Sequence, residues 1–476
     1  MLSRGQLLGA VCTFALISFV ASEARKRVKS FDDFATGGGS LGTIFVAGTI
    51  LGTIVGGAAT IGAAQLAFAY GLAGWWFSLG SCFALVFLGL VLSDKLRSAG
   101  VKTIPQFLVN TYGDRVGPWS WLFTSIGLLL NIIGQVLAAT SLLSTVFGVK
   151  PVFAALVTFL AMMLYVIYGG VWSTGSVGVA KTLLVLGSML VVGFVADRLA
   201  GGVSNIARAL PRYPYFSLFG RGLWTDLAAG FSLLVGVAST QTYLQALFSG
   251  KDPRAAKRGA LLAAAITPVA GLPGVYVGMH MKVTQPGISA ASALPLFVTQ
   301  YLHPVLAGIV LATLFISVIG TAAGLSLGVG VMFGQDIFKK RLRPAATDRQ
   351  VLVASRLAIG VVGAAALVMA LAGLDSLILK WSFLSMGLRG STVFFPLLGA
   401  VFFKRHVSRR AGLLAIAAAP LLSLAWGAVF PEGIDPLYIG LVTSLVCLWA
   451  GSVFMPDAGS APMPDQPRQA QRAPLS

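Results

Sequence analysis

Long apolar stretches, separated by short polar segments, dominate the order of hydrophobic and polar residues along this chain. Most are long enough to cross the ~30 Å hydrocarbon core of a bilayer as α-helices. The pattern therefore predicts an all-α integral membrane protein with about 13 transmembrane helices. The predicted spans cover residues 5–23, 41–71, 74–93, 117–147, 151–172, 176–197, 223–248, 259–281, 304–334, 351–372, 378–402, 411–430 and 436–455.

The second stretch has an unusual glycine content. Residues 41–72 carry no charge but contain seven glycines, including the pair Gly56–Gly57. A straight helix of this length would reach ~48 Å, well beyond the bilayer core. We expect a helix that breaks midway and frees backbone carbonyls for an ion or solute, as in secondary transporters. The alternative is a tilted, unbroken helix whose glycines serve close packing.

Span nine, 304–334, is also long and rich in glycine, with Gly320, Gly324, Gly328 and Gly330. Two interrupted spans in two halves of a chain suggest an inverted repeat, here spans two to six and seven to eleven. The predicted segments are residues 1–40 (first span and cytoplasmic loop), 41–200 and 201–405 (two five-helix repeats), 406–455 (two peripheral spans) and 456–476 (disordered cytoplasmic tail).

Composition and charge agree with a membrane location. The chain is 57% hydrophobic and 10% charged, and its mean hydropathy is +0.87. So little polar surface excludes a water-soluble domain of this size. The net charge of +19 gathers in alternate loops, which the positive-inside rule places in the cytoplasm. We expect a plasma (inner) membrane protein with its N-terminus outside and its C-terminus cytoplasmic, and no nucleic-acid partner.

The N-terminus allows two interpretations. Residues 1–24 have the basic start, apolar centre and small-residue end of a secretory signal. The basic residues Arg25, Lys26, Arg27 and Lys29 follow at once. Such a cluster favours an uncleaved first span whose C-terminal end lies in the cytoplasm.

Several motifs point to a known family. Tyr165-Val-Ile-Tyr-Gly169-Gly170-Val-Trp-Ser173 combines an aromatic residue, a glycine pair and a small residue soon after it. Other landmarks lie at Phe31-Asp-Asp-Phe with Gly42, at Thr103-Ile-Pro-Gln-Phe-Leu108 with Tyr112-Gly113, at Gln241 to Asp252, and at Gln335-Asp-Ile-Phe-Lys339. In this order the motifs resemble those of the sodium/solute symporter family, over roughly residues 30–412.

The resemblance implies the five-plus-five inverted-repeat fold of the leucine transporters, with broken helices at spans two and seven. It also implies ion-coupled uptake of a small polar solute by alternating access. The family's main sodium site combines carbonyls at the break in span two with a carbonyl and two hydroxyls of span nine. The matching positions are Gly52 and Val55 on span two, and Ser317, Gly320 and Thr321 on span nine.

One hydroxyl of that sodium site is missing, because Gly320 stands where the family usually has Ser or Thr. Hard cations depend on several oxygen ligands, so a site made of Gly52, Val55, Ser317 and Thr321 would bind Na⁺ more weakly. Family members with a second sodium site carry Asp at the position of Gly178.

Lys181 lies one turn beyond Gly178, inside an apolar span. Intramembrane charges are costly and usually functional. In some sodium-independent transporters of this wider fold, an ammonium on the equivalent helix replaces the sodium ion. Lys181 could do the same, and burial would help it to release a proton. The coupling ion would then be H⁺ rather than Na⁺. The alternative is a lysine that extends to the cytoplasmic membrane border.

Arg389 falls near the middle of span eleven, and no acidic residue is near it in sequence. Its guanidinium suits a carboxylate, which suggests a small organic anion such as a monocarboxylate as the substrate. It could instead clamp backbone carbonyls at a helix break. Other polar residues within the spans could complete a substrate site: Gln65, Asn131, Gln135, Thr240, Gln241 and Tyr243.

The sequence also bears on three other classes of protein. His280, His303 and His406 lie apart in the sequence, and no acidic cluster accompanies them. The sequence therefore shows no group of residues for acid–base catalysis or metal binding. No pore motif indicates a channel. A membrane-embedded sensor without net transport is the remaining alternative to a symporter. We expect no cofactor beyond a coupling Na⁺ or H⁺, and no obligate protein partner; the bilayer and a small solute are the expected partners.

Overall fold

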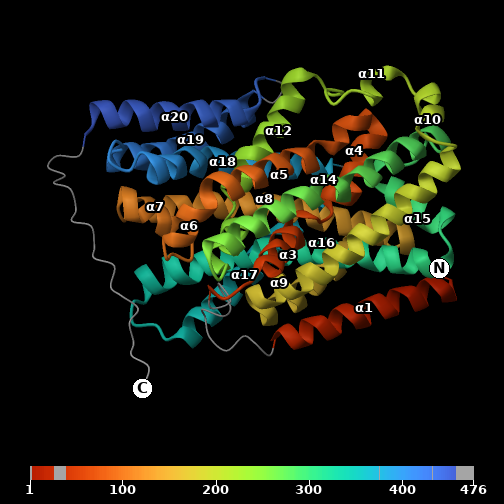
Figure 1. Ribbon diagram of the computed structural model, residues 1–476, viewed down its shortest axis with the longest axis horizontal. Helices are drawn as coiled ribbons and strands as arrows, with labels where there is room; N and C mark the ends of the chain where they lie inside the picture. The colour runs from red at the N-terminus through yellow and green to blue at the C-terminus, as the bar shows by residue number, and fades with distance from the viewer. Residues whose placement is uncertain (1–2, 26–38, 375, 431–432, 457–476) are drawn as a thin grey trace.

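The computed structural model describes residues 3–25, 39–374, 376–430 and 433–456, except the side chains of residues 24–25 and 166–176. In these ranges every regular element is a helix, as predicted. Figure 1 shows long helices lying side by side. The motif at residues 31–38, most of the 165–173 motif's side chains and residues 457–476 of the predicted tail fall outside this description.

The helices follow the predicted spans, with several shorter elements between them. Those of the first half are α1 (Arg4–Arg25), α3 (Thr43–Ile54), η2 (Ala58–Gly62), α4 (Ala63–Tyr70), η3 (Gly71–Trp75), α5 (Trp76–Phe87), η4 (Leu88–Leu92), α6 (Ser93–Ser98), α7 (Ile104–Tyr112), α8 (Val116–Phe147) and α9 (Pro151–Ala200). Those of the second half are α10 (Val203–Ala209), α11 (Arg212–Tyr215), α12 (Leu223–Ala238), α13 (Gln241–Ser249), α14 (Pro253–Thr284), η5 (Ala290–Ser292), α15 (Ala293–Tyr301), α16 (Pro304–Met332), η6 (Phe333–Leu342), α17 (Asp348–Ala372), α18 (Ile378–Phe402), α19 (Arg409–Val429) and α20 (Pro436–Phe454).

Ten of the described helical segments are long and apolar enough to cross a membrane, or eleven if the bent pair α12 and α13 counts as one span. The count of thirteen therefore stays a prediction. Two shorter apolar helices, Thr43–Ile54 and Pro151–Tyr165, account for the difference from the predicted number.

Helix α9 covers both predicted spans five and six. Tyr165 and Lys181 would lie ~24 Å apart on a straight helix. Both nevertheless approach Gly320: a Cβ there would lie 3.7 Å from the Tyr165 hydroxyl and 3.4 Å from the Lys181 Nζ. The helix is therefore not straight between these two residues.

Span two breaks where the sequence predicts. Helix α3 ends at Ile54, Val55 leaves helical geometry with φ −84° and ψ 79°, and a π-helical turn begins at Ala58. The glycines in between have no room for a side chain. A Cβ at Gly56 would lie 2.3 Å from the Thr321 Oγ1, and one at Gly57 would lie 2.5 Å from the Ala138 Cβ. The glycine pair therefore lets the broken backbone touch α8 and α16.

Span seven contains the second break, where α12 and α13 meet at an angle of 42° around Ser239 and Thr240. Span nine is not interrupted, in contrast to the prediction, because α16 runs unbroken from Pro304 to Met332. Its glycines serve packing instead: a Cβ at Gly324 would lie 2.6 Å from the Thr53 Oγ1. The two breaks in the described residues therefore lie in spans two and seven, and the inverted repeat stays a prediction.

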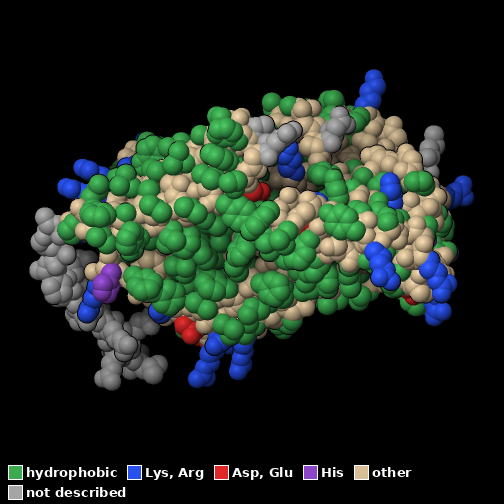
Figure 2. Space-filling model, turned by 90° about the horizontal axis from the view of Figure 1, so that it is seen from above, with side chains coloured by type: hydrophobic (Ala, Val, Ile, Leu, Met, Phe, Trp, Pro, Cys, Tyr) green, Lys and Arg blue, Asp and Glu red, His purple; other side chains and the backbone are tan. Residues whose placement is uncertain are grey.

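Helices α8, α16 and α18 are buried over most of their length, as are the shorter α3 and α13, whereas α1, α17, α19 and α20 expose much of their apolar surface. Figure 2 shows one face, on which hydrophobic side chains cover most of the surface and lysines and arginines gather towards its edges. A bilayer requires such a surface, because its core offers no hydrogen-bond partners.

The ends of the two broken spans meet at one point. Leu41 and Gly250 form an isolated parallel bridge. The Leu41 amide donates to the Ser249 carbonyl at 2.9 Å, and the Lys251 amide donates to the Leu41 carbonyl at 2.8 Å. The start of α3 and the end of α13 are thus joined through their main chains.

Candidate ion and substrate site

Lys181 lies inside the predicted sodium position. Its Nζ donates to the Gly52 carbonyl at 2.5 Å, to the Ser317 carbonyl at 2.8 Å and to the Thr321 Oγ1 at 3.1 Å. The side chain is 1% exposed. An ammonium has three N–H donors, and all three have partners here. The lysine therefore does not extend to the membrane border, which was the alternative from sequence.

The remaining predicted ligands surround the same point. The Ser317 hydroxyl donates to the Val55 carbonyl at 2.6 Å, and the Thr321 hydroxyl lies 3.4 Å from the Gly52 carbonyl. A Cβ at Gly320 would lie 3.3 Å from the Lys181 Cδ. The glycine that removes a hydroxyl thus also makes room for the lysine stem.

Gly178 holds α9 against α3. A Cβ at this position would lie only 2.1 Å from the Gly48 carbonyl oxygen, so the two backbones touch. An aspartate could enter only if the helices moved apart. This close contact also brings Lys181, one turn further along α9, within reach of the carbonyls at the end of α3.

Arg389 is fully buried and reaches the break in span seven. Its Nη1 donates to the Thr240 Oγ1 at 2.6 Å, and its Nη2 donates to the Ser385 Oγ at 2.8 Å. The Nε donates to the Ser385 carbonyl and the Nη2 also to the Met386 sulfur. All these acceptors are neutral, and the described residues offer Arg389 no ion pair. Four of the five N–H groups of the guanidinium have partners.

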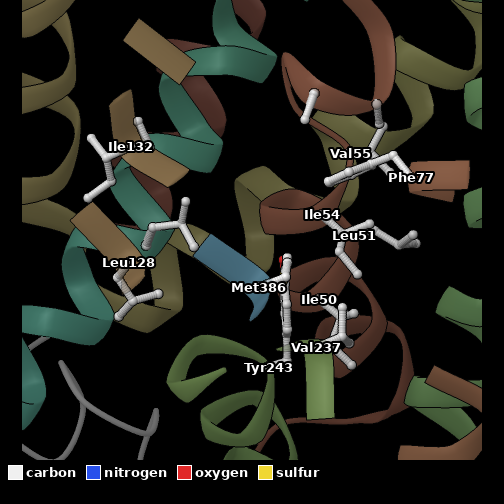
Figure 3. Close-up of a cluster of buried hydrophobic side chains, with 14 of the residues drawn as sticks. Ile50, Leu51, Ile54, Val55, Phe77, Leu128, Ile132, Val237, Tyr243 and Met386 are labelled. Carbon is white, nitrogen blue, oxygen red and sulfur yellow. The ribbon is translucent and has the colours of Figure 1, made fainter. Parts of the chain in front are cut away.

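Arg389 borders a cluster of buried hydrophobic side chains, because its Nη2 contacts the Met386 sulfur. Figure 3 shows the labelled members of this cluster, which come from α3, α5, α8, α12, α13 and α18 and from Val55 at the break in span two. The arrangement combines a buried cation with hydrophobic surfaces.

Gln135 and Asn131 join each other and the first break. The Gln135 Nε2 donates to the Asn131 Oδ1 at 3.2 Å, and the Gln135 Oε1 accepts from the Gly57 amide at 2.8 Å. These two residues, which share one face of α8, thus supply an acceptor to a backbone amide that the broken helix leaves free.

Gln65 and Gln241 lie away from this centre. The Gln65 Oε1 accepts from the Ile378 amide at 3.0 Å, at the start of α18. The Gln241 side chain accepts from the Ile104 amide at 2.8 Å and donates to the Lys102 carbonyl at 3.0 Å. Both side chains join the broken spans to neighbouring segments, and their role as substrate ligands stays a prediction.

Sequence reasoning missed Ser239 and Ser385. The Ser239 hydroxyl is buried at the break in span seven and has no hydrogen-bond partner among the described residues. Ser385 orients Arg389 and donates to the Gly127 carbonyl. Ser239 could have been predicted as a site residue, because it directly precedes the predicted site residue Thr240. Ser385 could not, because serines are common in membrane spans. No cluster of potential metal ligands occurs in the described part of the chain.

The oxygens of Gly52, Ser317 and Thr321 form a cage around the Lys181 Nζ, between the broken helix α3 and α16. This cage and the two broken spans define the leucine-transporter-like class of secondary transporters. Residues 34–416 match the sodium:solute symporter family, so the chain belongs to this family and is a multi-pass membrane transporter.

Solved structures support the fold. A Na⁺-coupled sialic acid symporter in a substrate-bound outward-open state has a TM-score of 0.79 at 18% identity, covering 95% of this chain and 98% of that chain. A nucleobase-cation-symport-1 family transporter has a TM-score of 0.59 at 13% identity, covering 87% and 93%. A manganese transporter of Eremococcus coleocola has a TM-score of 0.52 at 15% identity, covering 87% and 94%. At these identities the likeness concerns the fold alone.

Proposed function

We propose that this protein imports a small organic anion, such as a monocarboxylate, across the plasma membrane, and that Lys181 replaces Na⁺ as the coupling group. The observation that carries the proposal is the Lys181 Nζ within 3.1 Å of three oxygens at the family's sodium position. The N-terminus would lie outside and the C-terminus in the cytoplasm.

An ammonium and a sodium ion would compete for the same oxygens. The carbonyls of Gly52 and Ser317 and the Thr321 hydroxyl already point at Lys181. A second cation within a few ångströms would be repelled, because the buried site offers little screening. Sodium could bind only after Lys181 had left the cage or lost its charge.

The way the Lys181 site is built supports proton coupling. One wall is the end of α3 and the other is α16, and Lys181 on α9 bridges them. A neutral amine has one donor fewer than an ammonium and no charge, so it would hold the two walls less firmly. Release of the proton to the cytoplasm would thus favour separation of α3 from α16, and reprotonation would restore the closed cage.

The anionic substrate is inferred from Arg389. A buried charge without a partner costs about 3–5 kcal/mol, and the acceptors around this guanidinium are all neutral. A carboxylate bound beside the guanidinium would supply the missing charge through charge-assisted hydrogen bonds. The neighbouring hydrophobic side chains, such as Met386, would suit a short aliphatic or aromatic remainder.

The test is uptake of labelled small carboxylates into proteoliposomes, with Na⁺ and H⁺ gradients imposed separately. We expect wild-type uptake when the outside is acidic, no response to Na⁺, and loss of proton-driven uptake in Lys181→Ala. Lys380→Ala, which removes an exposed lysine, is the matched control. Sodium-driven uptake that survives Lys181→Ala would contradict the coupling role, and absence of saturable uptake for every carboxylate would contradict the substrate class.

A further inference from the structure

A cavity of about 350 Å³ lies between α1, the end of α8, the start of α9 and the first half of α16. Its lining is apolar except for Gln6, and Phe14, Phe153 and Phe315 form much of the wall. An apolar cavity of this kind does not hold ordered water, because water requires polar partners. Such a cavity suits the acyl chain of a lipid.

The cavity continues into surface that faces the bilayer. Leu7 and Val11 on α1 are each 56% exposed, and Phe153 at the start of α9 is 59% exposed. In a multi-pass membrane protein such surface is covered by lipid chains. The occupant must therefore come from the membrane rather than from water.

Close contact between α1 and α16 shapes this groove. A Cβ at Gly9 would lie 2.2 Å from the Val305 carbonyl oxygen, and one at Gly308 would lie 1.9 Å from the Gln6 carbonyl oxygen. Glycines at such a crossing let two membrane helices touch through their backbones. Beside the crossing α8 and α9 form the remaining walls, and the groove remains between the four helices.

The mouth of the groove is basic. Arg4 lies two residues before Gln6, and Lys150 lies next to the lining residue Val149. Both are exposed and neither has an ion pair or side-chain hydrogen bond within the described residues. The lining elements contain two acidic residues, Glu23 at the opposite end of α1 and Asp197 near the end of α9, and neither is adjacent to a lining residue. Two unpaired cations beside hydrocarbon suit a phosphate headgroup.

We propose that this groove binds an anionic phospholipid, with one acyl chain between α1 and α16 and the phosphate near Arg4 and Lys150. The site is independent of the transported solute and of the coupling ion. Its back wall includes Phe315, two residues before the cage residue Ser317 on α16.

The test uses photoactivatable lipids in nanodiscs that contain the full-length protein. Phosphatidylglycerol and phosphatidylcholine, each with a diazirine near the end of one acyl chain, are compared, and the labelled peptides are mapped by mass spectrometry. Ala10→Phe and Ala312→Phe fill the groove, and Leu357→Phe on the lipid-facing side of α17 is their matched control. The double variant Arg4→Gln/Lys150→Gln removes the basic mouth, and Arg208→Gln on the exposed side of α10 is its control.

We expect phosphatidylglycerol to label groove peptides of α1 and α16 several-fold more than phosphatidylcholine does. Either filling variant should abolish this labelling, and removal of the two cations should make the two lipids equal while the protein remains folded. Groove labelling no stronger than that of α17, equal labelling by both lipids in the wild type, or labelling that persists in both filling variants would overturn the proposal.

Discussion

Lys181 and Arg389 are two buried cations, and neither has a carboxylate partner among the described residues. Their surroundings nevertheless differ. Lys181 has an acceptor for each of its three donors, so its site is complete without a ligand. Arg389 has neutral acceptors and an uncompensated charge. At the scale of single residues, we therefore propose that Lys181 replaces a ligand and that Arg389 requires one.

The first residue-scale prediction concerns the missing hydroxyl. Lys181→Ala would vacate the cage, and Gly320→Ser would add the oxygen that the family usually has. We expect the double variant to show uptake stimulated about tenfold by Na⁺, a gain of about 1.4 kcal/mol in Na⁺ binding. Lys181→Ala alone should respond less. Gly320→Ser alone should impair uptake, because its Cβ would lie 3.3 Å from the lysine stem. A double variant indifferent to Na⁺ would argue against this site.

The second residue-scale prediction concerns the substrate. Arg389→Gln should weaken carboxylate binding by about 2–5 kcal/mol, because it removes one partner of a buried charge pair. Binding of a labelled carboxylate to purified protein measures this, with Lys380→Gln on the same helix as the control. If Arg389→Gln lowers the melting temperature but leaves the affinity unchanged, Arg389 is a structural clamp instead.

At the scale of elements, the break in span two depends on acceptors from another helix. Gly57 begins a turn after the break, and its amide finds the Gln135 side chain rather than a carbonyl of its own helix. Helix α8 is continuous and buried over most of its length. A rigid helix thus supports a broken one, and the broken helix can keep its carbonyls directed at Lys181.

This support predicts a stability effect. Gln135→Leu would leave the buried Gly57 amide without an acceptor, at a cost of about 1–3 kcal/mol. We expect a lower melting temperature in a thermal-shift assay of the purified protein. Ser144→Ala on the same helix is the control, because the Ser144 hydroxyl has no partner among the described residues. Equal melting temperatures for Gln135→Leu and the wild type would show that water or another group supplies the acceptor.

The sequence allowed prediction of the elements better than of their breaks. Gly56 and Gly57 marked the first break because only glycine fits there. Around the second break, Ala238 to Gln241 contain neither glycine nor proline, so only the family resemblance indicated it. The glycines of span nine suggested a break that does not exist, because glycine spacing cannot distinguish close packing from interruption. Likewise, burial of Lys181 depends on α3 and α16, which are distant in sequence.

At the scale of the whole molecule, the bridge between Leu41 and Gly250 joins the ends of the two broken spans. Arg97 reinforces this point by donating to the Gly250 carbonyl. Alternating access requires one side of the site to open while the other closes. With their ends joined, α3 and α13 should move as a pair when the cytoplasmic side opens.

A disulfide tests this paired movement. Bridged residues are close enough for a disulfide, so Leu41→Cys with Gly250→Cys, in a background without Cys12, Cys82 and Cys447, should cross-link under mild oxidation. Because α3 and α13 should move as a pair, we expect the oxidised protein to transport as well as the reduced protein. Uptake that falls to background on oxidation and returns with a reducing agent would show that opening separates Leu41 from Gly250. Each single cysteine variant is the control for oxidation itself.

The backbone contact between Gly178 and Gly48 also limits how this transporter could change over evolutionary time. A mutation that introduced aspartate at position 178 would meet the Gly48 carbonyl oxygen before it could serve any ion. We therefore do not expect a lineage that carries this contact to gain an ion ligand at position 178 by a single mutation. The backbones of α3 and α9 would first have to move apart, and the same movement would disturb the contact between Lys181 and the end of α3. We therefore expect descendants to inherit Lys181 together with Gly48 and Gly178.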